Sequence, residues 1–124
     1  MRVLMSIKPC FANAILSGEK RYEYRRRIFS DTSVNTMLIY ATHPVSKVIG
    51  QVHIDAIMHD DLETIWRNTH EFGCIDHDSF IQYFTDLSEA YAIKLSDPRR
   101  YASGLRLCQL SNRITRPPQS FMYV

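Results

Sequence analysis

Alternating apolar and polar positions predict several β-strands in this chain. Residues 3–8 and 20–27 alternate with the two-residue period of a strand that has one buried face. Residues 36–42 form an apolar run that is typical of a buried strand. Residues 47–58 alternate over a longer stretch, in which Gly50 indicates a bulge or a close approach between backbones. These four segments predict a sheet that begins near the N-terminus.

Helix-capping residues stand between the predicted strands. Pro9 suits the first position of a helix, where its missing N–H would have no partner. Gly18 suits the left-handed residue that ends a helix, so the two predict a short helix between the first strands. A second helix is predicted after Asp60 or Asp61, and a third after Asp76, because aspartate is a favoured N-cap residue.

The C-terminal part of the chain completes the predicted fold. Residues 91–95 alternate as a strand, Asp97–Pro98 predicts a turn, and residues 104–110 predict a further strand. A double proline then fixes an extended entry into a last short strand within residues 116–124. About six short strands and three short helices predict an α+β fold, a small mixed β-barrel formed by one domain over residues 1–124.

The composition narrows the class of protein. The chain is 45% hydrophobic and 23% charged, as in an ordinary globular domain, and no apolar run is long enough to cross a bilayer. The N-terminal sequence MRVLMSIKP lacks the pattern of a secretory signal. Three widely separated cysteines suit reduced thiols better than a disulfide framework. We therefore expect a cytoplasmic protein without a membrane partner.

The net charge of +2 conceals three blocks of different sign. Residues 1–54 carry eight basic residues against three acids, residues 55–97 two against ten, and residues 98–124 five arginines and no acid. If the terminal blocks lie together in the fold, they form a basic surface that attracts phosphate beside an acidic surface that repels polyanions. Alternatively, the blocks interleave in space and their charges cancel.

Three short motifs make the chain resemble a known family. Residues 6–9 (SIKP) precede the first helix, and residues 18–25 follow it with the pattern G-x-K-x-x-E-x-R. Together they resemble the signature of the ASCH domain, a family of the PUA-like class. Residues 117–121 (PPQSF) are similar to the ending of a bacterial single-domain subgroup of that family. The resemblance covers nearly the whole chain and makes residues 59–86 an acidic helical insertion between barrel strands.

The resemblance implies a barrel of five or six strands with flanking helices, and a cleft beside the Gly-x-Lys turn for RNA or a modified nucleoside. Some family members are nucleoside amidohydrolases that remove the acetyl group of N4-acetylcytidine, and others are described as RNA-binding or RNA-cleaving. The amidohydrolases have a threonine nucleophile where this chain has Glu23. Their mechanism therefore does not transfer directly, although a carboxylate could still activate water.

The Gly-x-Lys motif supplies the first candidate residues. Lys20 could contact phosphate as a point charge or act as a base with a pKa lowered by burial, and the alternative is a solvated turn lysine. Glu23 and Arg25 lie two residues apart and could either contact a ligand or form a structural salt bridge. The predicted ligand-binding residues are Ser6, Lys8, Lys20, Glu23, Arg25, Arg26, Tyr40, Ser46, Lys47, Gln119 and Ser120. If the protein is an enzyme, Lys20 and Glu23 are the predicted catalytic residues.

Arginine and tyrosine interleave within residues 20–27. Such a run suits nucleic acid, since arginine contacts phosphate and tyrosine stacks on bases. Strand alternation, however, predicts that Tyr22 and Tyr24 face the core.

Two function classes follow from these residues. The first is an RNA- or nucleotide-binding module with a basic cleft near the Gly-x-Lys turn, and the second is a nucleoside amidohydrolase or a ribonuclease-like hydrolase. A third, weaker hypothesis is a protein partner docked on the acidic helices through Trp66. His70, Cys74 and His77 are too loosely spaced for a typical zinc site, so we expect no metal and no cofactor. The sequence leaves the oligomeric state open.

Overall fold

The fold is built on one six-stranded, strongly curled sheet. The structure is a computed structural model that describes all residues from 1 to 124. In chain order its elements are β1 (Arg2–Ile7), α1 (Pro9–Ser17), β2 (Tyr22–Arg25), β3 (Thr36–Ala41), β4 (Lys47–Asp61), α2 (Leu62–Thr69), the 3-10 helix η1 (His70–Phe72), α3 (His77–Tyr83), β5 (Glu89–Leu105), α4 (Leu107–Leu110) and β6 (Phe121–Tyr123).

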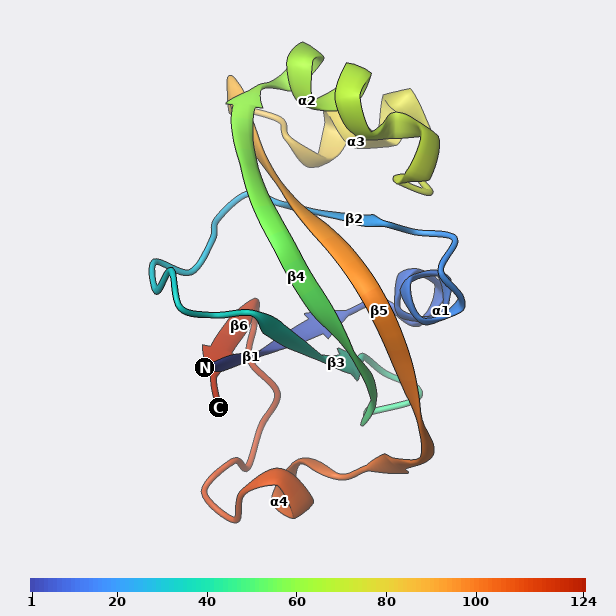
Figure 1. The fold of residues 1–124 in the computed structure, drawn as a ribbon, viewed down its shortest axis with the longest axis vertical. Coiled ribbons are helices and arrows are strands. Elements are labelled where there is room, and N and C mark those ends of the chain that lie inside the picture. The colour runs from blue at the N-terminus through green and yellow to red at the C-terminus, as the bar shows by residue number, and fades with distance from the viewer.

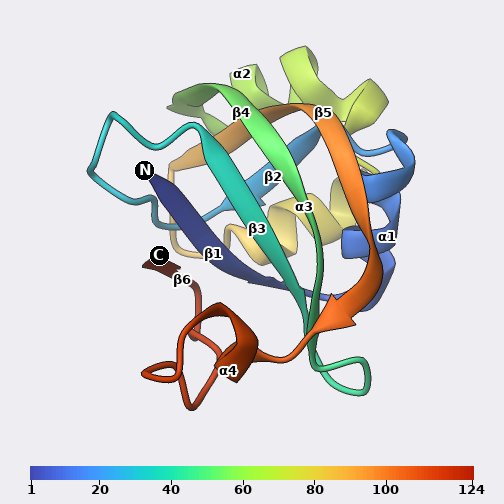
Figure 2. The ribbon, with the colours of Figure 1, turned by 60° about the horizontal axis from the view of Figure 1, so that its bottom comes forward.

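The strand order across the sheet is β2-β5-β4-β3-β1-β6. Strands β1 and β3 are parallel, and every other neighbouring pair is antiparallel. Figures 1 and 2 show the sheet curling as a half-barrel, with α1, α3 and α4 at different sides of it. The predicted α+β fold of the PUA-like class is confirmed.

The termini of the first helix follow the sequence pattern. Helix α1 begins at Pro9, and Gly18 ends it in the left-handed conformation with a φ of 87°. Asp61 and Asp76 cap α2 and α3 by accepting hydrogen bonds from the backbone N–H groups of Thr64 and Ser79. These predicted caps are confirmed.

Strands β4 and β5 form a long two-stranded ribbon that joins the two ends of the molecule (Figure 1). Its upper end carries α2 and α3, which pack with β2 around the apolar side chains of Tyr24, Ile65 and Phe80. The largest core cluster lies between α1 and the sheet and includes Met5 and Ile15. None of the helices has the length and hydropathy that a membrane-spanning helix requires.

Two predictions for the C-terminal part are wrong. Asp97–Pro98 does not form a turn between strands, because β5 continues through it to Leu105. The local irregularity is a bulge: Asp97 has a φ of 51°, and pairing with β4 resumes at Arg99.

The sequence predicts a strand over residues 104–110, but β5 ends at Leu105 and helix α4 follows. Leu107 and Leu110 are three residues apart and share a helical face, which packs against a cluster that contains Leu4 and Leu38. The Gln109 side chain accepts a hydrogen bond from the backbone N–H of Arg106 at 2.7 Å and stabilises this turn. Apolar packing in three dimensions therefore decides the conformation of a segment whose sequence also suits a strand.

Gly50 marks the close backbone approach that its place in a strand predicted. A Cβ atom at this position would lie 2.6 Å from the Arg99 carbonyl oxygen and 2.6 Å from Leu16 Cδ2. At Gly104 on β5 a Cβ atom would meet only the exposed Lys47 side chain, its flexible Cδ at 2.9 Å and its Cβ at 3.2 Å, and no backbone atom.

We expect Gly50→Ala to lower the free energy of unfolding by about 1–3 kcal/mol, because backbone and buried side chain must both shift. Gly104→Ala is the matched control and should change it by less than about 0.5 kcal/mol. Urea denaturation of the two variants measures both values. Equal stability of the two variants would contradict this account of Gly50.

Candidate functional site

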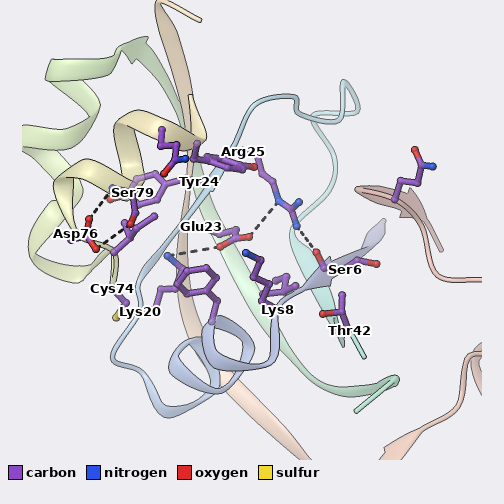
Figure 3. A pocket seen from close by; sticks show the side chains of 16 residues that line it. Ser6, Lys8, Lys20, Glu23, Tyr24, Arg25, Thr42, Cys74, Asp76 and Ser79 are labelled. Carbon is purple, nitrogen blue, oxygen red and sulfur yellow. Dashed lines mark hydrogen bonds and ion pairs between the residues drawn. The ribbon is translucent and has the colours of Figure 1, made fainter. Parts of the chain in front are cut away.

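A cavity lined by both charged and apolar side chains lies between the end of β1, the Gly-x-Lys turn and helix α3 (Figure 3). Its volume of about 680 Å³ is in the range of sites that bind small ligands. The lining side chains come from five separate parts of the chain: Ser6, Ile7, Lys8 and Phe11; Lys20, Glu23, Tyr24 and Arg25; Thr42; Cys74, Ile75, Asp76, Ser79, Gln82 and Tyr83; and Gln119.

The buried residues Lys20 and Glu23 and the largely buried Arg25 form a group of charges at the floor of this cavity, which we call the charged triad. Lys20 is 3% exposed and Glu23 is 7% exposed. Lys20 Nζ lies 3.9 Å from Glu23 Oε1, and Arg25 Nε lies 3.4 Å from Glu23 Oε2. With Lys20 protonated, two cations share one carboxylate, so the triad carries a net positive charge.

The Lys20 ammonium is held from several sides. It donates a hydrogen bond to the carbonyl of Gly73, and it lies 5.0 Å from the ring centroids of Phe11 and Tyr24. Burial lowers the pKa of Lys20 from its usual 10.5, and the negative charge of Glu23 partly offsets this effect. The sequence left a solvated turn lysine as an alternative, and the observed burial excludes it.

Arg25 links the triad to strand β1. Its Nη2 donates a hydrogen bond to the Ser6 carbonyl oxygen at 2.8 Å. Its Nε is buried and makes no hydrogen bond, because the nearby Glu23 carboxylate does not have the required geometry. A buried donor without an acceptor is uncommon, and an anion in the cavity could supply one.

The C-terminal segment reaches the cavity through β1. Ser6 Oγ donates a hydrogen bond to the Pro118 carbonyl at 2.7 Å, and the Ser6 N–H donates one to the Ser120 carbonyl at 3.2 Å. These two bonds fix the segment on either side of Gln119, whose side chain lies at the rim. The Gly-x-Lys motif and the PPQSF ending therefore contribute Lys20 and Gln119 to one cavity.

Six of the residues predicted to bind a ligand line this cavity: Ser6, Lys8, Lys20, Glu23, Arg25 and Gln119. The other five lie outside it. Tyr40 is 6% exposed in the apolar cluster with Leu4 and Leu38, and Ser120 contributes its backbone carbonyl to β1.

Arg26, Ser46 and Lys47 complete the set outside the cavity. Arg26 Nη1 donates hydrogen bonds to the carbonyls of Tyr83 and Thr85, at 2.8 and 3.0 Å, and so attaches the end of α3 to β2. Ser46 and Lys47 are exposed at the turn that enters β4. The core position predicted for Tyr24 is confirmed, and Tyr22 is half-buried against the same cluster.

Helix α3 supplies polar residues that the sequence analysis did not select. Ser79, Gln82 and Tyr83 lie on the face of α3 that borders the cavity. Their spacing of three and four residues places them on one side of a helix, and this spacing was the available signal. Nothing in the sequence showed that this side faces the Gly-x-Lys turn. The imidazole rings of His70 and His77 both pack against the Trp66 ring, with centroid distances of 5.3 and 5.0 Å.

No protein-family model matches the chain. The chain is 33% identical over 123 residues to a protein of Zymomonas mobilis named ASCH domain-containing ribonuclease, covering 98% of this chain and 82% of that protein. A crystal structure of ASCH from Zymomonas mobilis superposes with a TM-score of 0.91 at 33% identity and covers 99% of this chain and 87% of that one. The N-terminal domain of Staphylothermus marinus McrB, at 12% identity and a TM-score of 0.55, has a similar fold only.

The curled sheet and its flanking helices are those of a small PUA-like domain. The similarity over nearly the full length shows that the chain belongs to the ASCH domain family.

The lowered pKa of Lys20 has a measurable consequence. In protein labelled with ¹³C at the lysine Cε, the Lys20 resonance should titrate with a midpoint below 10.5. The unfolded chain then binds this proton more tightly than the folded one, so this group makes the free energy of unfolding rise with pH between the folded pKa and 10.5. A Lys20→Met variant identifies the resonance. A midpoint at or above 10.5 would contradict the dominance of burial over the attraction of Glu23.

Proposed function

We propose that the protein binds RNA and that the cavity accommodates one nucleotide. The observation that carries this proposal is the buried charged triad, in which Lys20 and Arg25 outnumber Glu23 at the floor of an open cavity. A buried excess of positive charge favours an anionic ligand, and phosphate is one of the anions that a planar guanidinium group binds through two hydrogen bonds.

The rim has the groups that a nucleotide needs beyond its phosphate. Exposed Lys8 can approach phosphate from the open side of the cavity. Gln82 and Gln119 carry amides that both donate and accept hydrogen bonds, as the edges of bases require. The Tyr83 ring, 38% exposed, offers a surface on which a base can stack. These groups support RNA more strongly than inorganic phosphate alone.

The relative from Zymomonas mobilis supports the same class of ligand, because its name describes it as a ribonuclease. We infer that this chain acts on the same kind of polymer in the cytoplasm, where its three exposed, unpaired cysteines would stay reduced.

RNA cleavage is the second candidate function, and the same relative favours it. In such a reaction Glu23 would take the proton of the ribose 2′-hydroxyl, whose oxygen would attack the adjacent phosphorus and expel the 5′-oxygen of the next nucleotide. Lys20 would stabilise the developing negative charge, and the expelled oxygen would take a proton from solvent. Both side chains line the cavity, and their charged atoms lie 3.9 Å apart. The amidohydrolase alternative has less support, since Glu23 replaces the threonine nucleophile of those enzymes.

The binding proposal predicts the effect of removing charge at the cavity. We expect Lys8→Gln and Arg25→Gln each to weaken the affinity for a short single-stranded RNA, and to reduce the slope of log affinity against log salt by about 0.7. Fluorescence anisotropy of labelled RNA measures both quantities.

Arg25→Gln could unfold the protein because Arg25 is largely buried. Lys8 is exposed, so Lys8→Gln should leave the fold intact and tests the proposal independently. The control Arg67→Gln on α2 should bind as the unmodified protein does. Affinity that does not depend on salt, or equal binding by all variants, would exclude the cavity as the RNA site.

The cleavage candidate predicts a different result for Glu23. The unmodified protein should shorten end-labelled RNA on a denaturing gel, and Glu23→Gln should reduce this rate by about 10²–10⁴-fold while the protein still binds. A parallel incubation with N4-acetylcytidine tests the amidohydrolase. If the unmodified protein leaves the RNA intact, the cleavage candidate is wrong and the protein is an RNA-binding module without ribonuclease activity.

A further inference from the structure

The structure carries a second feature suited to RNA, at the end of the molecule away from α2 and α3. Lys47 begins β4, and Arg99, Arg100 and Arg106 lie on or directly after the far part of β5. Strand pairing places all four at the same end of the β4–β5 ribbon: Gly50 lies opposite Arg100, Gln51 opposite Arg99, and Val48, next to Lys47, opposite Leu105, next to Arg106. We call this group the basic end.

The same ribbon places the acidic residues at its other end. Asp60 and Asp61 pair with the start of β5 at Ala90 and Glu89, and the acidic helices α2 and α3 lie beside them (Figure 1). From Gly50 to Asp60 the strand spans ten residues, or about 33 Å at about 3.3 Å per residue. Electrostatic screening at physiological salt acts over about 8 Å, so the two charged ends do not cancel each other.

Few carboxylates of the protein neutralise the cations of the basic end. Of the four, only Arg99 has a carboxylate within 4.0 Å, the exposed Asp97 at 3.3 Å. Arg100 donates a hydrogen bond to the neutral side chain of Asn13 at 2.8 Å. All four side chains belong to exposed residues, and residues 98–124 contain no acid. The basic end therefore attracts polyanions.

Two chain segments lead from the cavity towards the basic end. Thr42 lines the cavity and opens the turn that leads to Lys47. Helix α1 carries Phe11 of the cavity and also Asn13, which contacts Arg100. On the other side, the cavity borders α3 and its N-cap residue Asp76. A chain of phosphates that leaves the cavity is thus attracted in one direction and repelled in the other.

We propose that the basic end is a second contact region for single-stranded RNA, on which the phosphates that flank the bound nucleotide lie. The inference rests on the proposed function of the cavity and adds a direction to it. RNA extends past the turn at residues 42–46 towards Arg99 and Arg100, and away from α2 and α3. An oligonucleotide should therefore bind more tightly than a mononucleotide.

The test compares two double variants that each remove two exposed cations. Arg99→Gln/Arg100→Gln alters the basic end, and Arg67→Gln/Lys94→Gln removes both basic residues of the acidic block 55–97 as the matched control. Binding of a labelled ten-nucleotide single-stranded RNA is measured by anisotropy at several salt concentrations. Thermal melting checks that each variant is folded.

We expect the basic-end variant to bind roughly tenfold more weakly. Its salt slope should be smaller by about 1.4, for the loss of two phosphate contacts. The control should match the unmodified protein, and all three should bind a mononucleotide equally. If the two double variants bind the oligonucleotide equally while Lys8→Gln weakens it, the basic end is not a contact region and the cavity still is. If the unmodified protein binds no RNA at low salt, the proposed function itself is wrong.

Discussion

The buried Lys20 ammonium joins three parts of the molecule that meet at the cavity. Its hydrogen bond to Gly73 holds the segment between α2 and α3, its ion pair with Glu23 reaches β2, and the Phe11 ring beside it belongs to α1. Removing the ammonium would leave a buried carboxylate with one cation fewer and a carbonyl without its donor, and each loss is costly in a dry environment. The shape of the cavity and the charge at its floor therefore have the same origin.

Charge in this protein is organised on two scales. Locally, the triad leaves an excess of positive charge beside a buried Arg25 Nε that has no hydrogen-bond acceptor. Across the molecule, the register of β4 and β5 separates an acidic helical end from the basic end. The small net charge of the whole chain conveys neither feature, because the two ends are farther apart than the range over which solvent salt screens them.

Local signals predicted most of the fold. Proline at the start of α1, the left-handed Gly18 and the aspartate caps each act over a few residues, so the sequence alone identifies them. The strand predicted for residues 104–110 is wrong because residues 107–110 form α4, whose leucines pack against the apolar cluster beneath it. The turn predicted at Asp97–Pro98 is wrong because the pairing of β4 with β5 continues past this dipeptide, which forms a bulge within β5.

For the candidate site, too, local signals in the sequence were readable and packing in three dimensions was not. Residues inside the motifs, such as Lys20 and Glu23, were selected from the sequence, and the structure places them in one cavity. The sequence did not identify Ser79, Gln82 and Tyr83, because their position depends on how α2 and α3 pack against β2. Tyr40 was also predicted to bind a ligand, but burial against Leu4 and Leu38 keeps it outside the cavity.

The most direct test of the account is an NMR titration that follows the Nε–H signal of Arg25 as short RNA is added. The account predicts that this buried donor gains an acceptor, so its ¹H resonance moves downfield and saturates together with the backbone amides of Lys8 and Gln119. An Arg25 signal that stays unchanged at saturating RNA, with the perturbed amides confined to α2 and α3, would contradict it.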